Sequence, residues 1–347
     1  MVRPRVGILL GLLMGLGVVI LAACGAGTPP TATLLPTPTA NHFEGVPGIV
    51  DPFNFGWPRV VEGANGRVTI PAQPQRIITG SIGHDEVTYA LVPFERVVAV
   101  GAVSKDSTYS NVAALVQDVY VLSREPEVIL AQNPDVIVTS IFFANETVEA
   151  LTRVGIPVVQ TALKTDPQGQ VNSILFMGYI YGEEDRAVAF AQEIQARFAA
   201  LKAVVGDKPQ GDRARVMALA SYADTFYTAG TDSTEGGIIE AAGGINAAAE
   251  AGLEDNPTIS VESIIAMNPE VILITQPADS GEPVKADLLS NAALAQVSAI
   301  KDGRVYVVDP KLFTTLSYWN VLGAEELARL LWPEDLGDFE SGGFSIP

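Results

Sequence analysis

Short apolar runs alternate with segments of helical spacing along most of the chain. Residues 76–80 (RIITG) and 96–101 (RVVAVG) are apolar runs of strand length, and residues 84–92 between them have helical character. Strands buried in a parallel sheet are nearly continuous apolar runs, and a crossover, usually a helix, connects each one to the next. The alternation therefore predicts βαβ units and an α/β fold with parallel sheets.

One short pattern occurs twice within this alternation. Residues 127–139 read EVILAQNPDVIVT, and residues 262–274 read ESIIAMNPEVILI. Each copy has an acidic residue, an apolar helical run, the triplet Asn-Pro-acid and a strand-like run, and the proline is expected to end the helix. The two copies fall at equivalent places in two halves of the chain, which predicts two similar lobes rather than a solenoid.

A long helical region separates the two halves, because no strand signal interrupts residues 172–205. One apolar stripe recurs there at steps of three and four, at Phe190, Ile194, Phe198, Leu201 and Val205. We expect two Rossmann-like parallel-sheet lobes, at 58–165 and 207–347, joined by a long interlobe α-helix within a spine at 166–206. The alternative is a long surface helix on one large domain.

The chain begins with the pattern of an export signal. The segment MVRPR has two arginines and no acid, and the uninterrupted apolar run VGILLGLLMGLGVVILAA follows it. The small residues before Cys24 resemble the bacterial lipobox, which predicts a signal peptide at 1–23 and lipidation of Cys24. A transmembrane anchor is the alternative, because the apolar run is close to spanning length. Residues 24–57, rich in proline and threonine at their start, are expected to form an extended tether.

Composition and charge narrow the class of protein. The 347 residues are 48% hydrophobic and 18% charged, which suits two globular lobes. Loss of residues 1–23 would remove Arg3 and Arg5 and no acid, so the formal charge would go from −19 to −21. Such an acidic body argues against nucleic acid as a partner. Cys24 is the only cysteine, so no intrachain disulfide can form.

The chain resembles the extracytoplasmic substrate-binding proteins that serve ABC importers of ferric siderophores, cobalamin and haem. The resemblance covers residues 66–336. Behind the lipobox it rests on five stretches in order: PQRIITGSIGHDEVTYAL, PEVILAQNPDVIVTS, AAGGINAAAEAG, ISVESIIAMNPEVILI and LAQVSAIKDGRVYVVD. It implies a monomeric, lipid-anchored carrier on the extracytoplasmic side of the cell membrane, with its ligand between the lobes and a dimeric permease as its partner.

The resemblance also implies a role for the repeated pattern. In the family, each lobe carries a surface glutamate that pairs with arginines on one half of the permease, and the matching positions are Glu127 and Glu262. A two-fold symmetric permease needs one such charge on each lobe of its carrier. Judged from the residues alone, the alternative is an early-helix acid stabilised by the helix dipole. The segment SREPE departs from the family pattern and adds Glu125 as a competing acid.

Ligands of parallel α/β lobes bind beyond the carboxyl ends of the strands, and aromatic residues are frequent in the loops expected there. Aromatic side chains suit a large, flat, partly apolar ligand, although they also pack into lobe cores. His84 is the only histidine of the expected globular body, and it is either a ligand of haem iron or a hydrogen-bonded loop residue. The predicted ligand-binding residues are His84, Asp85, Tyr109, Phe142, Tyr222, Tyr227, Tyr318 and Trp319.

The same loops contain few cations, only Lys105 and, at the margin, Lys311. Desolvated anions need charge-assisted hydrogen bonds, so we expect a neutral or weakly charged chelate such as a hydroxamate siderophore or a corrinoid. Two alternatives of the same fold are a haem carrier and a molybdate- or tungstate-type oxyanion carrier, the latter using backbone N–H groups and the hydroxyls of Ser81, Ser221 and Thr225. A third is a lipoprotein that senses its ligand without transport.

The sequence argues against an enzyme. The expected body has one histidine and no cysteine, and residues 298–301 (SAIK) match Ser-x-x-Lys without its partner motifs. No phosphate-binding Gly-Lys-Ser/Thr loop is present. A single histidine also argues against a resident zinc site, so we predict no metal and no cofactor apart from the transported ligand.

Overall fold

The computed structural model describes residues 41–223, 225–336 and 342–344. The predicted signal peptide, the lipidation site Cys24 and the first part of the predicted tether lie outside these residues. None of the described helices is both long enough and apolar enough to cross a membrane.

The N-terminal lobe is built on a five-stranded sheet in which every neighbouring pair is parallel, as the sequence predicted. The strand order is β5-β4-β3-β6-β7, so the direction of winding reverses between β3 and β6. The strands are β3 (Ile77–Thr79), β4 (Val97–Val100), β5 (Tyr120–Val121), β6 (Val136–Thr139) and β7 (Val158–Gln160). The helices of this lobe are α1 (Ile82–Leu91), α2 (Pro126–Leu130) and α3 (Asn145–Arg153).

A hairpin that the sequence analysis missed precedes this sheet. Strands β1 (Arg59–Gly63) and β2 (Gly66–Ile70) pair antiparallel, and Asn65 beside the turn bonds to β7. The preceding residues also differ from the expected tether. Phe43 and Val46 are buried, and the Asn41 side chain donates to the Pro52 carbonyl at 2.9 Å. Residues 41–46 therefore belong to the folded body, because Phe43 and Val46 pack into its core.

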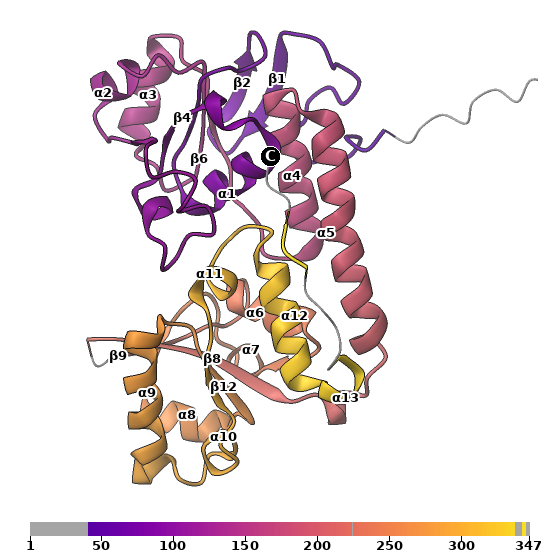
Figure 1. Ribbon diagram of the computed structural model, residues 1–347, viewed down its shortest axis with the longest axis vertical. Helices are drawn as coiled ribbons and strands as arrows, with labels where there is room; N and C mark the ends of the chain where they lie inside the picture. The colour runs from indigo at the N-terminus through magenta and orange to yellow at the C-terminus, as the bar shows by residue number, and fades with distance from the viewer. Residues whose placement is uncertain (1–40, 224, 337–341, 345–347) are drawn as a thin grey trace, which may run out of the picture. The chain divides into compact units, whose positions relative to one another are not determined.

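The spine consists of two helices, α4 (Pro167–Tyr181) and α5 (Glu184–Val205), which lie side by side in Figure 1. Asp166 caps α4 by accepting from the Gly169 N–H at 2.9 Å, and Gly182 ends it in the left-handed conformation, at φ +70°. The helices pack closely because Gly178 has no side chain where α5 presents Ala187. The predicted apolar stripe is confirmed as the buried face of α5.

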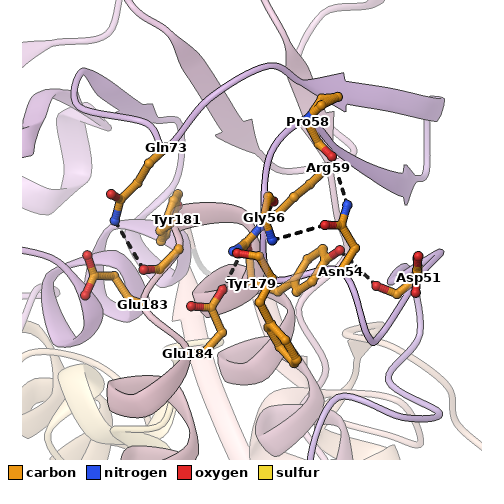
Figure 2. A network of polar contacts seen from close by, with 12 residues as sticks. Asp51, Asn54, Gly56, Pro58, Arg59, Gln73, Tyr179, Tyr181, Glu183 and Glu184 are labelled. Carbon is orange, nitrogen blue, oxygen red and sulfur yellow. Dashed lines mark hydrogen bonds and ion pairs between the residues drawn. The ribbon is translucent and has the colours of Figure 1, made fainter.

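Two buried arginines attach the turn between α4 and α5 to the N-terminal lobe. Arg59 pairs with Glu184 (Figure 2). It also donates to the Phe55 carbonyl at 2.7 Å and contacts the Trp57 ring. Arg96 pairs with Glu183 and donates to the Pro74 carbonyl at 2.8 Å. A buried guanidinium is tolerated only when its N–H groups and its charge are satisfied. These contacts therefore tie the spine firmly to the first lobe.

The C-terminal lobe departs from the expectation of a parallel sheet. Its strand order is β11-β9-β8-β12-β13, with β10 also pairing with β8. Strands β10, β12 and β13 continue the parallel pattern, whereas β9 folds back on β8 and pairs antiparallel with it and with β11. The strands are β8 (Arg215–Tyr222), β9 (Thr225–Thr228), β10 (Ile245–Asn246), β11 (Thr258–Ile259), β12 (Val271–Ile274) and β13 (Val305–Val307).

Helices cover this second sheet and connect it to the spine. They are α6 (Thr234–Ala241), α7 (Ala247–Glu250), α8 (Val261–Met267), α9 (Ala278–Ser290), α10 (Ser298–Lys301), α11 (Pro310–Phe313), α12 (Asn320–Leu331) and α13 (Pro333–Leu336). Arg197 of α5 pairs at 3.1 Å with Glu325 of α12, whose side chain is 1% exposed. The fold class is therefore confirmed as two α/β lobes joined by a long helix, with the second sheet mixed.

Candidate functional site

A hollow of about 390 Å³ lies between loops of the two lobes. The N-terminal lobe contributes Ser107 and Thr108, and the C-terminal lobe contributes Pro277, Ala278 and residues 307–311. These residues follow strands β4, β12 and β13, so the hollow lies where parallel strands end. Ligands of open α/β sheets bind at such places. A larger hollow of about 780 Å³ is lined by residues of the N-terminal lobe alone.

Three predicted tyrosines gather near the boundary between the lobes. The rings of Tyr222 and Tyr227 meet edge to face, with centroids 6.0 Å apart. Partial burial raises the pKa of Tyr222, and the neighbouring Tyr109 and Glu235 raise it further. Tyr109 belongs to the N-terminal lobe, so its electrostatic effect on Tyr222 acts across the boundary between the lobes. Tyr222 is 52% exposed, which leaves much of its ring free to contact a ligand.

Glu235 in this group was not a sequence-based candidate. It lies in the first turn of α6, and burial raises the pKa of its carboxyl group, which a hydrogen bond with Asn256 partly offsets. Its carboxylate adds an acid rather than a cation beside the tyrosines. The pattern TEGGIIEA marks it only as an ordinary early-helix acid, so no sequence signal separated it from other such residues.

Phe142, Tyr318 and Trp319 are placed elsewhere. Phe142 is 89% exposed on the loop before α3. Tyr318 is 1% exposed and stacks on Trp319, with ring centroids 5.5 Å apart, while Phe190 of α5 meets its edge at 4.6 Å. Phe344 packs against both rings. Tyr318 and Trp319 thus belong to an aromatic cluster that joins the spine to the second lobe.

His84 and Asp85 are both buried in α1. His84 Nδ1 lies 2.7 Å from Ser81 Oγ, and burial lowers the pKa of the imidazole to about 4, which the backbone of Thr161 partly offsets. Asp85 accepts from the Gly101 N–H at 2.8 Å and from the Ser104 hydroxyl. Burial raises the pKa of Asp85 to about 7, although these hydrogen bonds oppose the effect. These contacts hold both side chains inside the first lobe.

Glu86, the next residue, connects the two lobes. Its carboxylate accepts hydrogen bonds from Asn111 in the first lobe and from Thr315 and Ser317 in the second. Burial raises the pKa of Glu86, and these hydrogen bonds oppose that effect. No local sequence signal marks this role, because Thr315 lies 229 positions away in the chain.

The two glutamates of the repeated pattern occupy equivalent positions. Glu127 and Glu262 are both exposed in the first turn of their helices, α2 and α8. In the view of Figure 1 these helices lie on the side of the lobes away from α4 and α5. A hydrogen bond with Ser260 lowers the pKa of Glu262, so this side chain is charged at neutral pH. Glu125, the competing acid, is also exposed and precedes α2.

The cations of the expected ligand loops are already engaged. Lys105 donates to the Gln117 carbonyl at 2.8 Å, and Lys311 lies 3.5 Å from the Asp309 carboxylate. Among residues 41–223, 225–336 and 342–344, no three His, Cys, Asp or Glu side chains converge as metal ligands would. The tyrosine group and the nearby hollow can therefore hold a polar, partly apolar molecule without supplying an unpaired lysine.

Comparison with known proteins bears out the resemblance seen in the sequence. A family model described as "Periplasmic binding protein" matches residues 77–312. A protein of Halobacterium salinarum named "Cobalamin-binding protein" is 28% identical over 294 residues, which cover 83% of this chain and 74% of that protein. A Bacillus subtilis protein named "Uncharacterized ABC transporter substrate-binding lipoprotein YvrC" is 24% identical over 276 residues, covering 79% and 85%.

A solved structure shows the same fold. The molybdate periplasmic binding protein MolA of Haemophilus influenzae, bound to molybdate, aligns with a TM-score of 0.69. The sequences are 22% identical, and the alignment covers 81% of this chain and 94% of MolA.

Proposed function

Because the chain belongs to the periplasmic binding protein family, we propose that it captures a metal chelate between its lobes and delivers it to the permease of an ABC importer. The observation that carries this proposal is the electrostatic effect of Tyr109, in the first lobe, on Tyr222, in the second, whose ring meets that of Tyr227. A site shared by two lobes lets closure and capture occur together. In this role the protein is a carrier and not an enzyme.

The expected ligand is a hydroxamate siderophore or a corrinoid. Phenol rings supply large contact areas with a polar tip, and Lys105 and Lys311 are already engaged by other groups. An acidic residue, Glu235, beside Tyr222 disfavours a highly charged anion. The Halobacterium relative, named for cobalamin binding, supports the corrinoid. At about 390 Å³ the hollow is at the small end for ligand sites, so such a chelate requires the lobes to move apart before it enters.

Delivery would use the two exposed glutamates. Glu127 and Glu262 present one carboxylate on each lobe, at the same position of equivalent helices. A permease dimer with a cationic group on each half would recognise both at once, and the pairing would fix the orientation of the carrier. We further propose lipidation at Cys24, a monomeric carrier and an extracytoplasmic location at the membrane, which the lipoprotein name of the Bacillus relative supports.

Calorimetric titration with a panel of ligands tests the ligand class. The panel consists of cyanocobalamin, a ferric tris-hydroxamate, a ferric tris-catecholate, haem and molybdate. We expect tight binding of cyanocobalamin or the hydroxamate, and a loss of at least tenfold in affinity on Tyr222→Ala. Phe142→Ala is the matched control, because this exposed aromatic lies outside the tyrosine group. Binding of the catecholate alone, or equal affinity in the Tyr222 variant, would refute the proposal.

An oxyanion is the second candidate. The small size of the hollow and the hydroxyls of Ser107 and Thr108 in its lining favour it, and MolA has the same fold. Binding of molybdate without any chelate in the same panel would select this function.

A further inference from the structure

The carboxylate of Glu86 is saturated by four hydrogen bonds. One oxygen accepts from the backbone N–H and from the side-chain amide of Asn111, each at 2.9 Å. The other oxygen accepts from the Thr315 hydroxyl at 2.6 Å and from the Ser317 hydroxyl. Glu86, Thr315 and Ser317 are each at most 2% exposed. Buried polar groups of this kind are costly to leave unpaired, so the arrangement is sharply defined.

The donors come from both lobes. Glu86 lies in α1 and Asn111 in the loop after β4, whereas Thr315 and Ser317 follow α11 in the second lobe. The Asn111 amide also donates to the Lys311 carbonyl at 2.9 Å, which adds a second bond across the same junction. We refer to Glu86, Asn111, Lys311, Thr315 and Ser317 as the interlobe junction.

The junction shares its loops with the expected ligand site. Asn111 is two residues beyond Tyr109, and the residues that line the hollow include Thr108 and Lys311 itself. A change in the junction must therefore move ligand-facing side chains of one lobe relative to those of the other. The spine is anchored to the first lobe by the arginine contacts at the turn between α4 and α5 and to the second lobe by the Arg197–Glu325 pair, whereas the interlobe junction connects the two lobes directly.

We propose that Glu86 is a positioning residue that holds the two lobes in the closed arrangement and thereby sets the width of the ligand hollow. The link to ligand capture rests on the proposed function, whereas the control of lobe spacing does not. Without the carboxylate, four donors lose their acceptor and water becomes the better partner. Opening of the lobes is the route by which water reaches them.

Two substitutions separate this role from simple stabilisation. Glu86→Ala removes both acceptor oxygens. Glu86→Gln keeps one oxygen for Asn111 and turns an N–H₂ group towards Thr315 and Ser317, whose hydroxyls rotate to accept it. The alanine variant is expected to open the lobes, and the glutamine variant to keep them closed.

Spin labels on cysteines at Glu149 of α3 and Asp287 of α9 report the spacing, because both positions are exposed helix surface on different lobes. The sole native cysteine, Cys24, is replaced by serine so that only these two sites are labelled. Double electron–electron resonance is recorded on the chain from residue 24 onward, without any ligand. We expect a longer and broader distance distribution for Glu86→Ala, and a distribution close to the parent for Glu86→Gln.

A folded Glu86→Ala protein with the parent distance distribution would overturn the proposal, even if its melting temperature fell. If that variant does not fold, Thr315→Val combined with Ser317→Ala removes only the donors of the second lobe and must give the same broadening. An unchanged distribution in that double variant is equally contradictory. No ligand is added, so failure of the chelate titrations leaves this test intact, and the reverse also holds.

Discussion

Because α4 and α5 are in close contact at Gly178, we predict that Gly178→Ala destabilises the protein. A Cβ atom at this position would lie 2.2 Å from the Cβ of Ala187 on α5. Real Cβ atoms do not approach so closely, and Ala187 is fully buried, so neither helix has room to yield. Gly178→Ala must therefore push the helices apart or distort one of them.

Two effects of opposite sign determine how much Gly178→Ala changes the free energy of unfolding. Alanine is favoured over glycine inside a helix by about 1 kcal/mol, which would stabilise the variant. Overpacking of a well-packed contact costs about 1–3 kcal/mol. The 2.2 Å approach places Gly178→Ala in the upper part of that range, so we expect a net loss of about 1–2 kcal/mol in the free energy of unfolding.

The double variant Gly178→Ala, Ala187→Gly moves the methyl group from one helix to the other. It removes the clash and exchanges one helix preference for the other, so its free energy of unfolding should return to within about 0.5 kcal/mol of the parent. Ala200→Gly on the exposed face of α5 measures the helix preference alone, with an expected loss of about 1 kcal/mol.

Urea unfolding followed by far-ultraviolet circular dichroism gives these values from the midpoint and slope of each transition. A Gly178→Ala protein more stable than the parent would show that helix preference dominates and that α4 and α5 are not in close contact. A double variant no more stable than Gly178→Ala alone would refute the assignment of the clash to Ala187.

Three further predictions concern docking, pH and the start of the folded body. Charge reversal at both Glu127 and Glu262 should abolish ligand uptake in cells and leave ligand affinity unchanged, because both residues are exposed and neither lines the interlobe hollow; normal uptake would exclude a docking role. Burial raises the pKa of Asp85 from 3.8 to about 7, so this group stabilises the fold below pH 4 and the stability is lost as pH rises towards 7. The buried His84, with its pKa lowered from 6.5 to about 4, acts with the opposite sign between pH 4 and 6.5. Asp85→Asn should remove this loss, so its stability relative to the parent should rise with pH between pH 4 and 7 in thermal melts, and a difference that stays flat or falls would contradict the assignment. Arg59→Met should lower the free energy of unfolding by about 3 kcal/mol, because Glu184 and several carbonyls lose a buried cation, and should expose residues 41–57 to limited proteolysis. Resistance equal to the parent would show that Arg59 does not hold this segment.

The lobes and their order were predictable because the repeated pattern is local. Apolar runs such as residues 271–274 and the proline that precedes each of them mark a helix followed by a buried strand, whatever lies elsewhere in the chain. The spine also breaks at a local signal, because Gly182 ends α4 in the left-handed conformation. The sequence analysis missed this turn because helical spacing resumes directly after it.

The features that were missed depend on distant partners. The first hairpin and the packing of Phe43 require a core that residues 41–70 do not themselves supply. Strand β9, residues 225–228 (TFYT), consists of residues with high strand propensity, but the sequence does not show that it turns back to pair antiparallel with β8 and β11.

In the candidate site, too, residues with local sequence signals were predicted and residues that depend on distant partners were not. Loop positions identified Tyr109, Tyr222 and Tyr227 as residues near the strand ends; the rings of Tyr222 and Tyr227 meet, and Tyr109 raises the pKa of Tyr222 from the other lobe. The same reasoning predicted that Tyr318 contacts the ligand, whereas in the structure its ring packs against Phe190 of the spine in a core cluster. Glu86 could not be recognised from sequence, because its role depends on hydroxyl groups of the other lobe.

Native mass spectrometry of the protein purified from its own host tests the central claim most directly. Capture between the lobes predicts one chelate per chain in the parent protein and in Phe142→Ala, and its loss from a Tyr109→Ala, Tyr222→Ala double variant. A small molecule retained at full occupancy by the double variant would place the binding site elsewhere. A parent protein that acquires no added mass from its host, or after incubation with the whole ligand panel, would contradict a chelate carrier.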